Sequence, residues 1–72
     1  MLVTRKTVTA VTALAARLEW AAMTEREDPL RRRILREAAN GLRGAINRPH
    51  RTEAALTAAL TEAREWADQW GV

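Results

Sequence analysis

The sequence predicts an all-α protein, an antiparallel three-helix bundle with helices over about residues 4–24, 28–47 and 50–70. Three observations support this fold class. Apolar residues recur at spacings of three and four along each segment, which is the period of an amphipathic helix. Two short polar breaks, each marked by a proline, separate the segments. Helices with such short connections pack as antiparallel neighbours, so residues 1–72 are expected to form a single small helical domain.

The first helix, about 4–24, carries one broad apolar side and a second, weaker stripe outside it. Thr4 or Thr7 can cap its start. The broad side consists of Val8, Val11, Leu14, Ala15, Leu18, Ala21 and Ala22. The second stripe consists of Ala13, Ala16, Trp20 and Met23. Apolar groups on two sides are typical of a helix with two neighbours.

The second helix, about 28–47, has a clear start signal and two contrasting sides. Asp28 can cap the first turn, and Pro29 then occupies the first helical position, where its missing N–H costs nothing. The apolar side consists of Leu30, Ile34, Leu35, Ala38, Leu42, Ala45 and Ile46. The opposite side consists of Arg32, Arg36, Asn40, Arg43 and Asn47, with Arg33 beside them. Gly41, between Ala38 and Ala45, predicts close approach by another helix, because glycine in a helix interior costs roughly 1 kcal/mol.

The third helix, about 50–70, has the most regular pattern in the chain. It is predicted to begin near Pro49 or Thr52, and Gly71 fits a C-terminal cap. Its apolar stripe consists of Ala55, Leu56, Ala59, Leu60, Ala63, Trp66, Ala67 and Trp70. Its opposite side consists of Glu53, Thr57, Thr61, Arg64, Glu65 and Asp68. Trp66 and Trp70 are expected to supply much of the bulk of the bundle.

The core of this domain is expected to be thin. Hydrophobic residues make up 47% of the chain, but many are alanine, which favours helix while burying little area. Phe and Tyr are absent. A domain of 72 residues has little stability to spare, so self-association into a homo-oligomer, most simply a dimer, is expected to complete the apolar burial.

Charge and cysteine content narrow the class of protein further. The net charge is +3, and the basic middle segment and the acidic last segment are expected to be neighbours that form ion pairs. The absence of cysteine excludes disulfides and thiolate metal sites. No apolar run approaches the roughly 20 residues of a membrane span, and the N-terminus lacks the apolar stretch of a signal peptide. A cytoplasmic protein is expected.

The side chains that could perform catalysis or hold a metal or cofactor are few. His50 is the only histidine, and serine and cysteine are absent, so no metal site, cofactor site or activated nucleophile is predicted. Glu62, Glu65 and Asp68 share one side of the last helix, but an exposed helix side lacks the burial that shifts a carboxyl pKa usefully. No catalytic residue is predicted, and the chain is not expected to be an enzyme.

The arginines of the second helix give two interpretations. They could donate to phosphates, which predicts a nucleic-acid surface, or they could be solvated and face an acidic protein partner. No aromatic side chain stands among them to stack on bases. A more specific version takes TRKTVTA, residues 4–10, as a strand with Arg5, Thr7 and Thr9 outward. This segment resembles the N-terminal ribbon of ribbon-helix-helix dimers, a resemblance that implies insertion into the DNA major groove.

The sequence therefore predicts a non-enzymatic protein-protein interaction module, a small helical regulator or inhibitor that binds a larger, acidic-surfaced protein. Nucleic-acid binding through the same arginines is the alternative. Trp20 lies off the main stripe of its helix, so it either anchors an interface or covers the end of the bundle or packs between helices. The candidate partner-binding residues are Arg32, Arg33, Arg36, Arg43, Trp20 and Met23.

Overall fold

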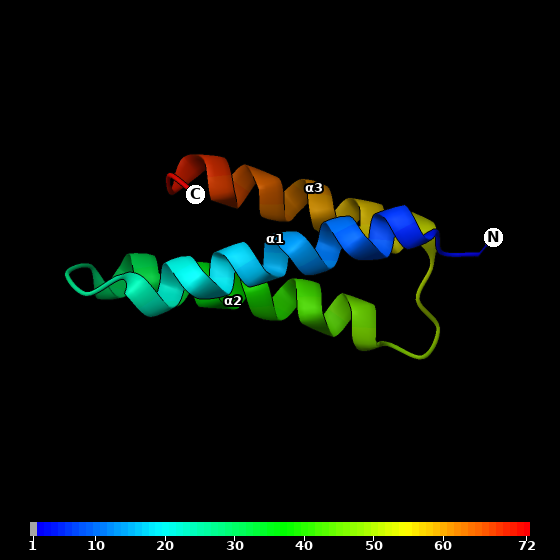
Figure 1. Cartoon of the computed structure of the whole chain (residues 1–72), viewed down its shortest axis with the longest axis horizontal. Helices are drawn as coiled ribbons and strands as arrows, with labels where there is room; N and C mark the ends of the chain where they lie inside the picture. Colours follow the sequence, from blue (N-terminus) through cyan, green and yellow to red (C-terminus); the bar gives the residue numbers. More distant parts are fainter. Residues whose placement is uncertain (1) are drawn as a thin grey trace.

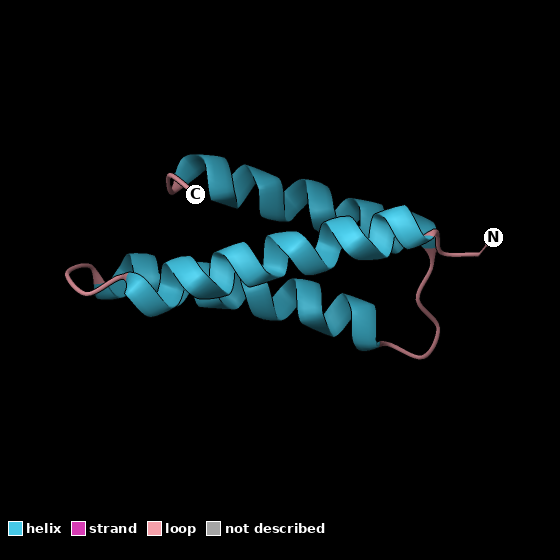
Figure 2. Cartoon of the chain, in the orientation of Figure 1, coloured by secondary structure: helices cyan, strands magenta, loops and turns pink. Residues whose placement is uncertain are grey.

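The computed structural model describes residues 2–72 and contains three helices (Figures 1 and 2). These are α1 (Arg5–Thr24), α2 (Pro29–Asn47) and α3 (Glu53–Gln69). They lie lengthwise in an elongated body of 43 × 20 × 15 Å, with α2 antiparallel to both of the others. Each helix packs against the other two, which confirms the predicted three-helix bundle. Met1 lies outside the described residues.

Each helix begins at a side-chain cap that the sequence supplies. The Thr4 hydroxyl accepts from the Thr7 N–H at 3.2 Å, and the Asp28 carboxylate accepts from the Arg31 N–H at 3.0 Å. The Thr52 hydroxyl accepts from the Ala55 N–H at 3.1 Å. These bonds satisfy N–H groups that have no partner within a helix. The third helix therefore begins at Glu53 with Thr52 as its cap, which agrees with the predicted start near Thr52 and lies later than the bound of about residue 50.

The C-terminal end of α3 is closed by the predicted glycine. Gly71 adopts a positive φ of 74°, which a residue without Cβ reaches at little cost. The Val72 N–H then donates to the Ala67 carbonyl at 2.8 Å, and the Gly71 N–H donates to the Asp68 carbonyl at 3.4 Å. This pair of bonds is the Schellman arrangement, and it satisfies the last carbonyls of the helix.

The core consists of aliphatic side chains from all three helices. Its buried residues are Val11, Leu14, Ala15, Leu18, Ala22, Leu35, Ala39, Leu42, Leu56, Leu60, Ala63 and Ala67. No polar side chain is buried within residues 2–72. The broad apolar side predicted for α1 supplies five of these residues and is confirmed. The buried side of α1 therefore follows the periodicity of its sequence.

The predicted apolar side of α2 is only partly right. Leu35 and Leu42 are fully enclosed, but so is Ala39, which the predicted stripe omits. Leu30, which the stripe includes, is 57% exposed. Ala39 lies one turn from both Leu35 and Leu42 and so shares their buried side. α3 ends opposite Arg31, the neighbour of Leu30, so no further turn of α3 covers Leu30.

Two further packing predictions for α3 are wrong. Ala55 is exposed instead of buried, and Trp66 is 38% exposed at the edge of the bundle. Trp70 is half-buried and packs against the core, as expected. The bulk of the core therefore comes mainly from leucines, because the α2–α3 contact stays open where Trp66 lies.

The strand considered for residues 4–10 does not form. Thr4 is the cap of α1, and the chain is helical from Arg5 onward, so the ribbon of a ribbon-helix-helix protein is absent from the described residues. The threonine caps and the continuous apolar side of α1 favour helix over the extended preference of single Val and Thr residues.

Candidate protein-interaction surface

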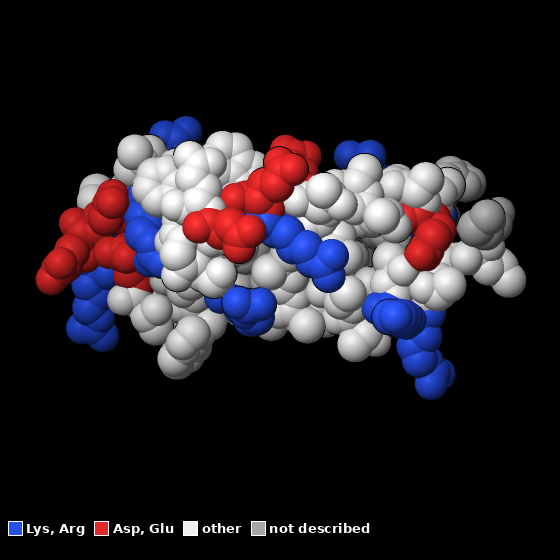
Figure 3. All heavy atoms as spheres, turned by 90° about the horizontal axis from the view of Figure 1, so that it is seen from above, with Lys and Arg blue, Asp and Glu red and all other residues white. Residues whose placement is uncertain are grey.

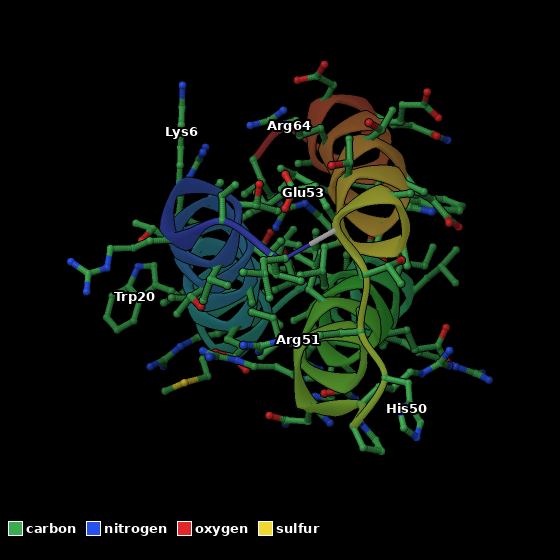
Figure 4. All side chains as sticks on the ribbon, turned by 90° about the vertical axis from the view of Figure 1, so that its right-hand side faces the viewer. Lys6, Trp20, His50, Arg51, Glu53 and Arg64 are labelled. Carbon is green, nitrogen blue, oxygen red and sulfur yellow. The ribbon has the colours of Figure 1, made fainter. Side chains whose placement is uncertain are left out.

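One side of α1 is apolar and is used by neither of the other helices. We call it the outer stripe, and it consists of the exposed residues Thr9, Ala13, Ala16, Trp20 and Met23. Their spacing places them opposite Val11 and Leu18, which are fully buried. Trp20 is 66% exposed and Met23 is 72% exposed. Figure 4 shows Trp20 pointing away from both α2 and α3. The outer stripe therefore contributes little to the folding core.

Arg43 of α2 forms an ion pair with Glu19 of α1 beside the outer stripe. Its Nη2 and Nε atoms donate to the two carboxylate oxygens of Glu19 at 2.8 and 3.1 Å. This hydrogen bond from Arg43 holds the pKa of Glu19 below its usual value, and the bond to Glu19 raises the pKa of Arg43. Arg43 was predicted to be a partner-binding residue. The structure instead gives it an intramolecular partner, and Glu19 was not singled out from the sequence.

Two other candidate arginines stay available on the same flank of α2. We call Arg32 and Arg36 the basic row. They lie three and two turns before Arg43 on the side that faces α1, so the row runs along the edge of α1 near the outer stripe. Neither forms an ion pair within residues 2–72. Together with Pro29, Arg33, Glu37 and Asn40 they frame a shallow hollow. The basic row is therefore free to meet a negatively charged surface.

Arg33 is exposed but not free. Its Nε atom lies 3.2 Å from Glu37 Oε1 one turn further along α2, and both side chains are more than half exposed. Exposed pairs of this kind stabilise a protein by about 0–1 kcal/mol and exchange readily for other partners. Arg33 is therefore a weaker candidate for binding than the basic row.

The ion pairs expected between α2 and α3 do not form. Within residues 2–72, the acidic partners of α2 arginines come from α1, from the α1–α2 connection and from α2 itself. A charged side chain of α2, Arg31, does contact the end of α3. Its Nε and Nη2 donate to the Trp70 carbonyl at 3.0 and 2.8 Å. The charge balance of the segments did not predict it, because a carbonyl left unpaired at a helix end carries no sequence signal.

Arg31 also closes the turn between α1 and α2. Its Nη1 lies 2.7 Å from Glu25 Oε2. Glu25 accepts from the N–H groups of Asp28 and Glu27 as well, and these bonds, together with Arg31, hold the pKa of Glu25 below its usual value. Arg31 is a structural residue that ties the end of α3 to this turn, and it is not part of the basic row.

Glu53 binds α1 although its predicted place was the outer side of α3. Its carboxylate accepts from the Thr7 hydroxyl and, at 3.1 Å, from the Thr4 N–H. These donors hold its pKa below the usual value, the Thr7 hydroxyl most strongly. Figure 4 shows Glu53 pointing between α3 and α1. The bond closes the end of the bundle at which α1 and α3 both begin.

An apolar groove lies on the opposite face of the molecule, between α2 and α3. It has a volume of about 310 Å³ and is lined by Ile34, Glu37, Ala38, Gly41, Leu42, Ala59, Glu62, Ala63 and Trp66. A Cβ atom added to Gly41 would meet nothing within 4 Å. The predicted close approach at Gly41 is therefore wrong. The small residues Ala38, Gly41, Ala59 and Ala63 therefore line a hollow instead of a close helix contact.

The structure brings no metal-binding cluster together in residues 2–72. His50 is exposed in the α2–α3 connection, and Figure 4 shows it pointing away from the helices. Glu62, Glu65 and Asp68 are exposed on α3. None of the three helices in the described part of the chain has the length and apolar content needed to cross a membrane.

Comparisons of the chain with protein-family models, with curated proteins and with solved structures find no match.

Proposed function

We propose that this chain is a non-enzymatic protein-interaction module, a small regulator or inhibitor that binds an acidic-surfaced protein. The observation that supports this most strongly is the exposure of Trp20 and Met23, at 66% and 72%, on a helix whose other side is fully buried. Tryptophan is enriched at the energetic centres of protein interfaces, and an apolar stripe that the fold leaves uncovered is typical of a contact surface.

The basic row gives this surface its preference for acidic partners. Arg32 and Arg36 project beside the outer stripe without intramolecular ion pairs in residues 2–72. Charges at the rim of an interface mainly accelerate association and select the partner, while a buried aromatic anchor supplies affinity. In the proposed surface the outer stripe therefore supplies the affinity, and the basic row attracts and selects the acidic partner.

Nucleic-acid binding through the same row is the alternative function. Arg32 and Arg36 could donate to phosphates, and their lack of an internal partner favours this as well. Arg43, Arg33 and Arg31 are already engaged by carboxylates, so the row offers two free guanidinium groups instead of an extended patch. A protein partner with a few acidic side chains suits this small number better.

The tagged chain and three variants, tested in nuclease-treated cell extract, distinguish these functions. We expect the parent chain to retain an acidic protein, and we expect Trp20→Ala and the double variant Arg32→Ala/Arg36→Ala to retain much less. Arg64→Ala, an exposed arginine on α3, is the matched control and should retain as much as the parent. The proposal would be contradicted if Trp20→Ala and Arg32→Ala/Arg36→Ala both retained as much acidic protein as the parent chain.

Duplex DNA and RNA provide the second readout. The proposed function predicts no measurable binding of either at low salt. Binding that weakens steeply with salt, with a slope flattened by Arg32→Ala/Arg36→Ala, would support the alternative instead.

A further inference from the structure

We propose that a second copy of this chain covers the outer stripe, in a dimer whose two α1 helices run antiparallel. This inference rests on the proposed function, since it names one occupant of the same surface. Because the acidic partner of the proposed function uses the same stripe, the second copy and that partner exclude each other there.

The sizes of the side chains along the outer stripe fit an antiparallel pair. The first half of the stripe carries small exposed residues, Thr9, Ala13 and Ala16, and the second half carries Trp20 and Met23. In an antiparallel pair the large half of each copy lies over the small half of the other, so Trp20 packs on the small residues Ala13 and Ala16 of the second copy. A parallel pair would oppose Trp20 to itself and leave the alanines uncovered.

The charges at the two ends of α1 support the same antiparallel direction. Arg5 and Lys6 begin α1, whereas Glu27 lies in the connection that follows the last residue of α1, Thr24. An antiparallel pair therefore brings Arg5 and Lys6 to the end of the second copy that carries this connection. Arg5, Lys6 and Glu27 are exposed, and none of the three forms an ion pair within residues 2–72. Size and charge thus both favour the antiparallel direction.

The distribution of charge over the whole molecule agrees with this alignment. Figure 3 shows acidic and basic side chains together at the end that carries the α1–α2 connection, and that connection holds three acidic residues, Glu25, Glu27 and Asp28, and one basic residue, Arg26. The opposite end of α1 begins with Arg5 and Lys6. An antiparallel pair joins unlike ends, whereas a parallel pair would bring Arg5 and Lys6 against the same residues of the second copy and repel.

The contact closes as a two-fold dimer and is small. Both copies use the same stripe, so the interface is isologous and does not propagate into a filament. α1 has 20 residues and is therefore about 30 Å long, which places a single helix pair at the low end of specific interfaces. A reversible dimer with a dissociation constant on the order of micromolar is expected.

The groove between α2 and α3 suits a two-fold contact less well. Glu37 and Glu62 both line it near Ala38 and Ala63. A two-fold axis through that region would bring these carboxylates against their own copies in the partner. The outer stripe carries no carboxylate at its centre, where the exposed Arg17 lies beside Ala16.

Sedimentation equilibrium of the full chain over a wide dilution series tests the proposal. The mass should rise with concentration from 8.1 kDa, the mass of one chain, toward twice that value. Trp20→Ala should remain at one chain mass throughout, and helical circular dichroism checks that it is folded. A parent chain that stays at one mass at all concentrations would overturn the proposal, and so would a Trp20→Ala variant that associates like the parent.

Charge reversal tests the antiparallel direction. Lys6→Glu alone and Glu27→Lys alone should each weaken the dimer several-fold, and the double variant Lys6→Glu/Glu27→Lys should recover it, because the second copy supplies the opposite charge. Arg64→Glu, the same change of charge on α3, is the control and should leave association unchanged. A double variant no better than the single ones would overturn the antiparallel alignment.

The two proposals fail separately. A chain that stays monomeric yet retains an acidic protein through Arg32 and Arg36 overturns the dimer and supports the proposed function. A chain that dimerises through Trp20 yet retains no acidic protein supports the dimer and overturns the proposed function.

Discussion

Two leucines of α2 allow the packing to be tested with a single kind of substitution. Leu35 is completely buried and Leu30, five residues earlier, is 57% exposed. Truncating a buried leucine to alanine costs about 2–5 kcal/mol, because the lost transfer free energy is added to that of the cavity. For Leu30 less than half of the side chain is shielded, so Leu30→Ala should cost about 1 kcal/mol or less.

These losses are large beside the stability of so short a chain. At about 0.05–0.15 kcal/mol per residue, 72 residues have a free energy of unfolding of roughly 4–11 kcal/mol. In a domain of this size 1 kcal/mol shifts the thermal midpoint by about 4–8 °C, so Leu35→Ala should lower it by at least about 10 °C. Urea and thermal unfolding followed by helical circular dichroism measure both variants. Equal losses from the two, or a larger loss from Leu30→Ala, would refute the packing of α2.

Three further substitutions test local features. Gly41→Ala should stabilise the chain by up to about 1 kcal/mol in urea unfolding, because the added Cβ meets nothing and alanine is the better helix former; a destabilised variant would mean that another helix does approach closely there. Thr52→Ala should cost about 0.5–2 kcal/mol by removing the cap of α3, and an unchanged midpoint would contradict that cap. Glu19→Gln should be less stable than the parent at pH 7. Because Arg43 lowers the pKa of Glu19 in the folded chain, the contribution of Glu19 is complete above its ordinary pKa of 4.5 and is lost as the pH falls through the lowered value. The two thermal midpoints should therefore converge in acid, and a difference that persists there would contradict an electrostatic origin.

The helix boundaries could be predicted because their signals are local. Asp28 with Pro29, and Gly71 after the last turn, act through their own backbone and nearest neighbours. The buried side of α1 could be predicted as well, since five residues of one stripe all face inward. Periodicity fixes the apolar side of a helix to within about one residue step.

The rotation of α2 could not be predicted in this way. Both Leu30 and Ala39 lie at the margins of its apolar side, and the neighbouring helices decide which margin is covered. Arg31, Glu19 and Glu53 were missed for a related reason. Each binds a group that lies far away in the sequence, and nothing in the neighbouring residues marks that pairing.

The candidate surface was predicted in outline from the spacing of Trp20 and Met23, which place both residues off the main stripe. Their exposure agrees with that spacing. The spacing of Arg43 does not distinguish it from Arg32 and Arg36, but Arg43 forms an ion pair with Glu19 across the α1–α2 contact. Position on a helix predicts which side chains can meet a partner, and only packing decides which of them are already paired.

The free energy of unfolding of Trp20→Ala shows whether α1 has a folding side and a separate binding side. The measurement is made on chain dilute enough to sediment at a single chain mass. We predict a value within about 0.5 kcal/mol of the parent, as for a surface position. Removal of a core tryptophan costs about 3–5 kcal/mol. A loss of that size would show that Trp20 supports the fold and would contradict a separate binding side on α1.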